Sequence, residues 1–180
     1  HLLAFYSDSQ FWASTAGAAE STRCKTFKSC EDQLQQLKKI TPYFEQKIAL
    51  MRLGIARGMT QPQVVLQGRD ASIARHIVNQ VEDSIFYQTF AQLPASLSNE
   101  QRAALQLRAK QVITEKVIPA YRHLYDFIRE EYLPNARTSI AAYDLPNGKE
   151  FYQAQILEYT TLSSTPEEIH AIGLSEVARI

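Results

Sequence analysis

One stretch of the sequence, residues 98–132, restricts the possible folds more than any other. Ser98 is followed three positions later by Gln101, which is the capping-box pattern that opens an α-helix. At 1.5 Å per residue, the stretch predicts a helix roughly 50 Å long that ends before Pro134. The side chains on its predicted inner face, all but one of them apolar or small, recur every three or four positions: Leu105, Ala109, Val112, Lys116, Ala120, Leu124 and Ile128.

A proline inside this stretch predicts a local distortion. Pro119 has no backbone N–H, and its ring crowds the carbonyl group of Glu115, four residues earlier. We therefore expect the long helix to kink between Glu115 and Pro119.

Helix start and stop signals also occur upstream of the long helix. Ser29 with Asp32 forms a capping signal, so we expect a helix to begin at Ser29. Thr41 followed by Pro42 predicts a second start, with threonine as the N-cap and proline at the first helical position. Gly58 is a typical helix stop, and it predicts the end of this second helix.

Further helices are predicted on both sides of the long one. A helix is expected over residues 62–79, although Gly68 weakens its middle by about 1 kcal/mol relative to alanine. Residues 144–148 have the composition of a turn, and residues 150–161 are predicted to be helical. Residues 165–168, Thr-Pro-Glu-Glu, combine an N-cap, a first-turn proline and two acidic residues, and they predict a last helix.

These patterns predict an all-α protein, an irregular bundle of about six or seven helices with one long proline-kinked helix. Residues 1–28 are rich in Ser, Thr, Gly and Ala, so we expect an irregular, loop-rich segment there. Residues 29–180 form the predicted helical domain, and we expect the natural chain to continue because no stop signal follows the last helix. Four aromatic residues are expected to hold the first segment on the body: Phe5, Tyr6, Phe11 and Trp12.

Charge and hydropathy exclude several classes of partner. The 180 residues contain 19 Lys and Arg and 19 Asp and Glu, so the formal net charge is zero. A chain with this balance does not bind nucleic acid or acidic membranes through bulk charge, and we expect no nucleic-acid partner. No apolar run approaches the ~20 residues that span a bilayer, so no transmembrane segment is predicted.

Two cysteines, Cys24 and Cys30, are the only ones in the sequence. In an exported protein they would close a short loop as a disulfide, whereas in a cytosolic protein they would be free thiols. The sequence leaves both alternatives open. Two sulfur ligands do not complete a tetrahedral zinc shell, so a zinc site here is not expected.

Catalytic motifs are missing from the sequence. It contains no His-Glu-x-x-His zinc motif, no Gly-x-Ser-x-Gly nucleophile motif and no glycine-rich phosphate loop. Glu167 and His170 have the i, i+3 spacing of di-iron bundles, but those sites need a second such pair and two further glutamates. We therefore predict no catalytic residue, no metal ligand and no cofactor in this stretch. His170 is expected to be partly buried and hydrogen-bonded, with plain surface exposure as the alternative.

Several segments, most of them in the last third of the chain, resemble a known family. The clearest are residues 144–152, DLPNGKEFY, residues 159–161, YTT, and residues 165–180, TPEEIHAIGLSEVARI. Residues 117–121, VIPAY, and 131–137, EYLPNAR, also match. The sequence resembles the large bacterial family catalogued as domain of unknown function 885. The resemblance covers most of residues 25–180 and is most specific in the last 40.

The resemblance implies a mostly helical protein that is often exported or anchored as a lipoprotein. The family is similar to zinc metallopeptidases of the gluzincin kind, and its proposed metal motif, His-Glu-x-x-Pro-Gly-His, lies downstream of the Thr-Pro-Glu-Glu-Ile-His segment. Zinc is therefore expected in the full-length protein and not in this chain. The residues that match the family pattern and are candidates to line the cleft beside the metal are Tyr152, Tyr159, Thr160, Thr161 and His170; the alternative role for them is helix capping and packing.

Two functions follow from this reading. The first is the helical, cleft-covering portion of a zinc-dependent peptidase-like hydrolase, inactive by itself, whose partners are the C-terminal catalytic half of its own chain and a peptide substrate. The alternative is a self-contained, non-catalytic helical module for binding or scaffolding. The resemblance implies an extracytoplasmic location, periplasmic or lipid-anchored, while the residues themselves leave a cytoplasmic one open.

Overall fold

The computed structural model of the chain describes residues 10–180, which are built from helices and the loops between them. No β-strand occurs in this part, so the all-α class is confirmed, and seven of the helices have ten or more residues. The elements in chain order, with 3-10 turns and π segments labelled η, are α1 Phe11–Ser21, α2 Phe27–Lys38, α3 Ile40–Ala56, α4 Gln63–Leu66, α5 Asp70–Ala74, η1 Val81–Asp83, α6 Gln88–Ala91, α7 Asn99–Val112, η2 Ile113–Val117, α8 Ile118–Phe127, η3 Ile128–Tyr132, η4 Ala142–Asp144, α9 Gly148–Thr160 and α10 Pro166–Arg179.

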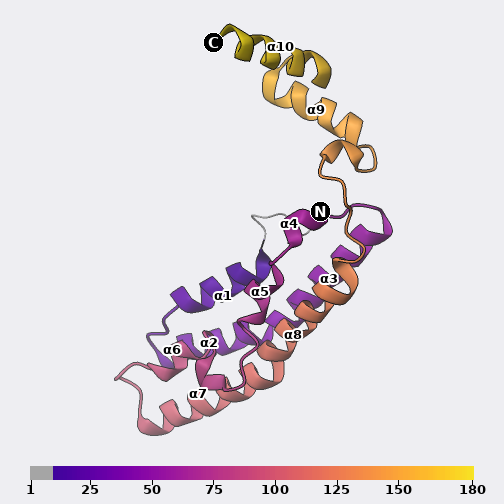
Figure 1. Cartoon of the computed structure of the whole chain (residues 1–180). Helices are drawn as coiled ribbons and strands as arrows, with labels where there is room; N and C mark the ends of the chain where they lie inside the picture. Colours follow the sequence, from indigo (N-terminus) through magenta and orange to yellow (C-terminus); the bar gives the residue numbers. More distant parts are fainter. Residues whose placement is uncertain (1–9) are drawn as a thin grey trace.

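Two long helical rods lie side by side and form the spine of the molecule (Figure 1). Helices α2 and α3 follow one another with only Lys39 between them, and α7, η2, α8 and η3 form the second rod. The rods run in the same direction: residues that lie further along the first rod contact residues that lie further along the second. The polar contacts between them are the ion pair of Glu31 with Arg108, a 3.1 Å hydrogen bond from Thr41 to the carbonyl of Lys116, and a two-fold 2.7 Å ion pair of Arg52 with Glu131.

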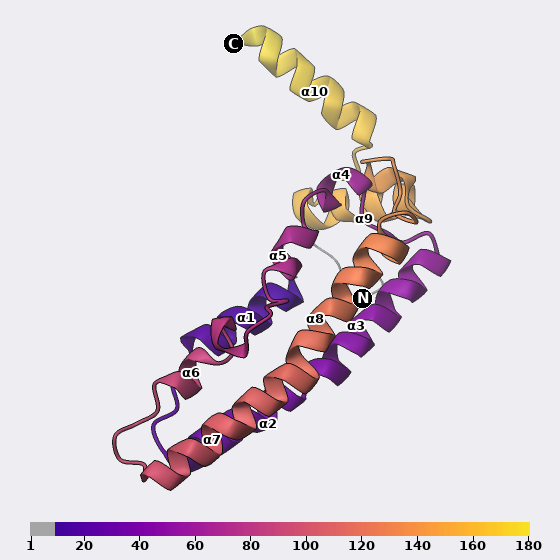
Figure 2. The same ribbon diagram turned by 60° about the horizontal axis from the view of Figure 1, so that its bottom comes forward.

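The core lies between these rods and the helices that cover them, α1, α5 and α6 (Figures 1 and 2). Tyr121 stands at its centre and is fully buried. Its hydroxyl donates a 2.7 Å hydrogen bond to the carbonyl of Trp12, and its ring lies 4.9 Å from the ring of Phe44 and 5.6 Å from that of Phe86, measured between centroids. The burial of large aromatic rings therefore joins α1, α3 and α8 into one core.

The prediction of an irregular segment over residues 1–28 was wrong for residues 11–21, which form helix α1. Phe11, Trp12 and Ala16 are buried on one side of this helix, at the helical spacing of four and five positions. Phe11 and Trp12 thus hold the segment on the body, as expected, and this burial outweighs the low helix propensity of the Ser and Thr residues. The predictions for Phe5 and Tyr6 lie outside the described residues.

Two predicted helix starts were misplaced by a few residues. Helix α2 begins after Thr26, which forms the capping box, and Ser29 is its N3 partner instead of the N-cap. Helix α3 begins at Ile40 without a side-chain cap. The hydroxyl of Thr41 is not a cap, because it donates to the carbonyl of Lys116 on the other rod. A tertiary hydrogen bond therefore replaces the local one that the sequence suggested.

Two glycines with left-handed backbone end helical segments. Gly58, with φ at +66°, ends α3 as predicted: its N–H donates to the carbonyl of Ile55, and the next N–H reaches Gly54, a complete Schellman motif. Gly68, with φ at +75°, interrupts the expected helix over residues 62–79. That prediction was wrong, because the left-handed turn divides the segment into the short helices α4 and α5.

The long helix predicted over residues 98–132 is present, with the capping box of Ser98 and Gln101 at its start. It departs from regular α-helix geometry at the π segment η2, Ile113–Val117, directly before Pro119. The wider π turn lies where the missing N–H and the proline ring disturb the hydrogen-bond ladder. The distortion therefore occurs in the predicted place and leaves the chain helical on both sides.

Helices α9 and α10 form an arm, residues 148–180, that projects from the rest of the molecule (Figures 1 and 2). The turn before it, residues 144–148, and both helices agree with the prediction. Thr165 caps α10 through a complete capping box with Glu168, and Pro166 is its first residue. The arm is thus ordered by its own local signals, and α10 buries no residue at all.

Candidate functional site

The five residues that resemble the family pattern all lie on the arm. Tyr152 and Tyr159 are on α9, where they are 44% and 80% exposed. His170 is on α10 and is exposed, so the expectation of a partly buried, hydrogen-bonded histidine was wrong. The reason is that α10 buries no residue, and the contacts shown for it are with α9. None of these residues lines the cavity described below, and their role as cleft-lining residues stays a prediction.

Thr160 and Thr161 end helix α9. The Thr160 hydroxyl donates a 2.6 Å hydrogen bond to the carbonyl of Ile156 and accepts one of 3.1 Å from the N–H of Leu162. Thr161 adopts the left-handed conformation, with φ at +60°, that a helix end requires. Both residues therefore have the capping role that was the alternative for them, and this role sets the direction of the link to α10.

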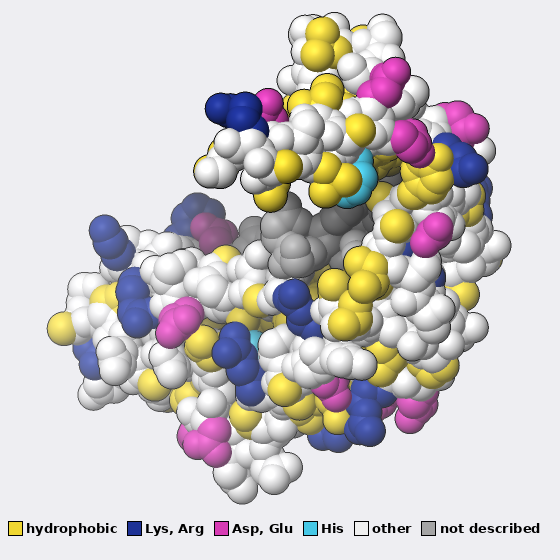
Figure 3. Space-filling model, turned by 45° about the horizontal axis from the view of Figure 1, so that its top comes forward, with side chains coloured by type: hydrophobic (Ala, Val, Ile, Leu, Met, Phe, Trp, Pro, Cys, Tyr) yellow, Lys and Arg dark blue, Asp and Glu magenta, His cyan; other side chains and the backbone are white. Residues whose placement is uncertain are grey.

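The surface of the arm is unusually apolar. Figure 3 shows hydrophobic side chains spread over it. Apolar side chains exposed in such number along two neighbouring helices are a candidate interaction surface. The large hydrophobic residues of the arm that are more than half exposed are Phe151, Leu157, Tyr159, Leu162, Ile172, Leu174, Val177 and Ile180.

Residues 10–180 contain no set of side chains that could hold a metal ion. No group of three or more His, Cys, Asp and Glu side chains comes together there. A catalytic zinc ion needs three protein ligands, so the residues present do not fit one. No zinc-dependent step is assigned to them.

Cys24 and Cys30 are joined in a disulfide, with 4.9 Å between their Cα atoms. Of the two alternatives that the sequence left open, the structure has the disulfide. The bond closes the short loop between α1 and α2, and Cys30 is fully buried. Disulfides of this kind persist in oxidising compartments.

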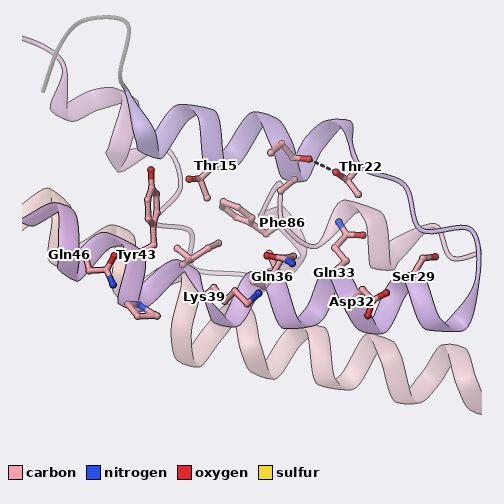
Figure 4. A pocket seen from close by; sticks show the side chains of 15 residues that line it. Thr15, Thr22, Ser29, Asp32, Gln33, Gln36, Lys39, Tyr43, Gln46 and Phe86 are labelled. Atoms are coloured by element: carbon pink, nitrogen blue, oxygen red, sulfur yellow. Dashed lines mark hydrogen bonds between the residues drawn. The ribbon is translucent and has the colours of Figure 1, made fainter. Parts of the chain in front are cut away.

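A cavity of about 770 Å³ opens between α1 and the α2–α3 rod, and Figure 4 shows the side chains that line it. Helix α1 contributes small residues, and Phe86 closes the side toward the core. The opposite wall carries the amide side chains of Gln33, which is buried, and of Gln36 and Gln46, which are exposed.

Gln33 is the most unusual residue of this cavity. It is only 8% exposed, and its Oε1 atom is buried without a hydrogen-bond partner among the described residues. An unpaired buried acceptor costs about 1–3 kcal/mol. Gln33 was not among the predicted site residues, although the sequence carries a signal for it: Gln33 lies on the buried stripe of α2 with Cys30, Leu34 and Leu37. A polar residue inside an apolar stripe at helical spacing would have identified it.

His76 is a second buried polar residue. It is 6% exposed, and its ring lies 4.8 Å from that of Tyr121 and 6.0 Å from that of Phe86. Its Nε2 atom accepts a 3.3 Å hydrogen bond from the Nε–H of Arg75. Burial, and after it the charge of Arg75, lowers the pKa of His76 to about 4. The imidazole is therefore neutral in the folded protein at physiological pH.

This lowered pKa predicts a loss of stability in mild acid. Between pH 6.5 and 4 the unfolded chain binds a proton at His76 that the folded chain does not, so stability is complete above pH 6.5 and falls as the pH falls. We expect the free energy of unfolding to drop by about 2 kcal/mol from pH 7 to pH 5. Urea denaturation at a series of pH values, followed by circular dichroism, measures this.

The matched variants are His76→Phe, which keeps a ring in the cluster, and His170→Phe on the exposed face of α10. His76→Phe is expected to remove most of the drop, and His170→Phe to leave it unchanged. An equal drop in wild type and His76→Phe would show that another group is responsible.

The described residues also include no helix with the length and hydrophobicity needed to cross a membrane. No curated protein matches the chain. Among solved structures, the crystal structure of the putative lipoprotein from Colwellia psychrerythraea is similar, with a TM-score of 0.73 and 25% sequence identity. The similarity covers 89% of this chain but only 28% of the lipoprotein chain.

The lipoprotein and the disulfide together suggest an extracytoplasmic protein. A family model described as a bacterial protein of unknown function, DUF885, matches residues 2–180. The matched part has the helical fold that the resemblance in sequence implied. Because this family model spans almost the whole chain, the protein belongs to the bacterial family of unknown function DUF885.

Proposed function

We propose that this chain is the helical, non-catalytic portion of a larger exported protein, and that its arm docks against a further section of the same polypeptide. The observation that carries the proposal is the apolar surface of α9 and α10, together with the absence of any buried residue in α10. The solved relative is more than three times as long as the part that this chain matches, which supports a longer protein.

The energetics favour such docking. Leu174 and Val177 lie three positions apart, on one face of α10, and are 60% and 75% exposed. Full burial of a side chain of this size contributes about 1.5–3 kcal/mol, so covering the exposed parts of these two residues alone would contribute about 2–4 kcal/mol. An amphipathic helix gains its stability in a protein mainly from such packing.

The proposed activity of the whole protein is that of a zinc-dependent, peptidase-like hydrolase that acts on peptides. In this proposal the zinc ligands lie in the further section, and the arm forms one side of the cleft, with Tyr152, Tyr159 and His170 toward the substrate. The support is the resemblance in residues 144–180 and the exposure of these three side chains. The periplasmic or lipid-anchored location belongs to the same proposal and is supported by the disulfide.

A self-contained helical module for binding or scaffolding is the second candidate. It is supported by the complete capping boxes of α2, α7 and α10 and by the continuous core of α1 to α8, which allow the chain to fold without a partner. The two candidates differ in what happens to the arm when a longer chain is present.

Three measurements test the proposal. The reading frame is expected to continue past the codon of Ile180, and a stop codon there would contradict docking within one polypeptide. Metal analysis is expected to find less than ~0.1 zinc per 180-residue chain and about one per full-length protein. Stoichiometric zinc in the 180-residue chain, or none in the full-length protein, would contradict the proposed hydrolase.

The double variant Leu174→Lys with Val177→Lys tests the docking surface itself. Because both side chains are exposed, it is expected to change the stability of the 180-residue chain by no more than about 0.5 kcal/mol. In the full-length protein it is expected to lower the melting temperature by several degrees, whereas Ser175→Lys, which faces away from the pair, is not. Equal melting temperatures for both full-length variants would contradict docking through this face.

A further inference from the structure

We propose that the cavity between α1 and the α2–α3 rod is a binding site for a neutral, apolar ligand that carries a secondary amide. The site is separate from the arm and does not depend on the function proposed above. Its volume of about 770 Å³ lies within the range of about 300–1,000 Å³ that small-molecule sites occupy.

The central observation is the orphaned acceptor in the wall of the cavity. Gln33 is 92% buried, and its Oε1 atom has no hydrogen-bond partner in residues 10–180. Buried polar atoms in folded proteins are almost always paired, so an unpaired one beside a cavity is a candidate position for a ligand group. The Oε1 atom is covered by its neighbours in the unliganded chain, so a donor reaches it once the amide turns toward the cavity. A carbonyl-type oxygen accepts hydrogen bonds only, and the missing group is therefore an N–H or O–H donor.

The other polar groups of the cavity favour a neutral ligand. The hydroxyls of Thr15 and Thr22 donate to carbonyl groups of their own helix, of Phe11 and Ala18, and so offer only acceptor positions. Asp32, the one acidic residue of the lining, is paired with Lys28 at 3.5 Å. Charged head groups thus have little to bind apart from the exposed Lys39 on the rim.

Two further side chains of the lining, Gln36 and Gln46, are amides like Gln33, and both are exposed. A primary amide pairs well with a secondary amide, since each offers both a donor and an acceptor.

The cavity also has an apolar wall that the apolar part of the ligand would contact. Leu37, Ile40 and Phe86 lie along the cavity beside the glutamines, and Figure 4 shows Tyr43 at one end. The small residues Ala18 and Ala19 on α1 leave the space open on the other side. An apolar side chain or acyl chain next to the amide would cover this surface. Such a ligand comes from one of two sources, an apolar peptide or an N-acyl compound, and both share the same chemistry.

The test compares the binding of two probes that differ only in one group, an amide N–H in one and an ester oxygen in the other. N-methyloctanamide carries an N–H that Gln33 Oε1 accepts, and methyl octanoate replaces that N–H by an oxygen atom that cannot donate. We expect the wild-type 180-residue chain to bind the amide about tenfold more tightly than the ester, as measured by titration calorimetry or by NMR chemical shifts of α1 and α2. N-acetyl-leucine N-methylamide is the peptide arm of the experiment, and the tighter of the two amides identifies the source.

Two variants assign the preference to Gln33. Gln33→Leu removes the acceptor and keeps a similar volume, so amide and ester are expected to bind within twofold of each other. Gln155→Leu on the arm is the matched control and keeps the tenfold preference. The proposal is overturned if wild type binds the ester as tightly as the amide, if it binds neither at millimolar concentration, or if Gln33→Leu retains the preference. The wild-type comparison stands even where a variant folds poorly.

Discussion

Replacing Trp12 by alanine is expected to lower the free energy of unfolding by about 3–5 kcal/mol, the usual cost of removing a buried aromatic side chain. Trp12 is 1% exposed, and its ring packs edge-on against that of Phe11 at 5.3 Å. Its indole Nε1–H donates a 2.9 Å hydrogen bond to the hydroxyl of Ser72 on α5. The truncation would thus leave a cavity and also loosen α1 from α5.

The measurement is urea denaturation followed by circular dichroism, because the variant has lost the only tryptophan of the chain. Gly17→Ala is the matched control in the same helix: a Cβ atom there meets nothing within 4 Å, and alanine stabilises a helix by about 1 kcal/mol over glycine. A loss of less than 1 kcal/mol for Trp12→Ala would show that α1 is not part of the core.

Replacing Gly148 by alanine is expected to disrupt the start of the arm at a cost of about 3 kcal/mol. A Cβ atom at this position would lie 2.3 Å from the carbonyl oxygen of Ala142 and 2.6 Å from that of Tyr143. Both are backbone atoms, which cannot rotate away as a flexible side chain can. The turn formed by η4 and the first turn of α9 must therefore separate.

Because the arm packs little against the body, the effect is expected to be local. Trypsin cleavage after Lys149, in the first turn of α9, should become about 100-fold faster, which corresponds to the lost free energy when cleavage follows local opening. Mass spectrometry identifies the cut. Gly173→Ala on α10, where a Cβ atom meets nothing within 4 Å, is the control and should not speed this cleavage. Unchanged cleavage in Gly148→Ala would contradict the close packing of the turn.

Much of the fold could be predicted from the sequence, because its strongest signals are local. The capping boxes of α7 and α10 were found at Ser98 and Thr165, since a cap depends only on residues three positions apart. Pro119 also predicted a local distortion, and the π segment η2 lies just before it. The stop at Gly58 likewise needed only a residue that tolerates a left-handed backbone.

The predictions that were wrong concern segments whose structure depends on contacts between residues far apart in the sequence. Helix α1 has a loop-like composition, and it is held by distant contacts: Trp12 donates to Ser72 on α5, and its carbonyl accepts from Tyr121 on α8. Thr41 has the identity of a cap, but its hydroxyl bonds to a residue 75 positions away. The candidate cavity was not predicted for a related reason: its walls come from two helices. The apolar stripe of α2 places Gln33 on the buried face, but no local pattern shows that its Oε1 atom lacks a partner.

Docking of the arm against a further section of the polypeptide is tested most directly by hydrogen exchange of the α10 backbone amides. In the 180-residue chain, the amides of residues 169–179 are expected to exchange within minutes, because α10 buries no residue. In the full-length protein the same amides should exchange at least 100-fold more slowly, since docking would bury the face that carries Leu174 and Val177. Equal exchange rates in the two proteins would contradict the account.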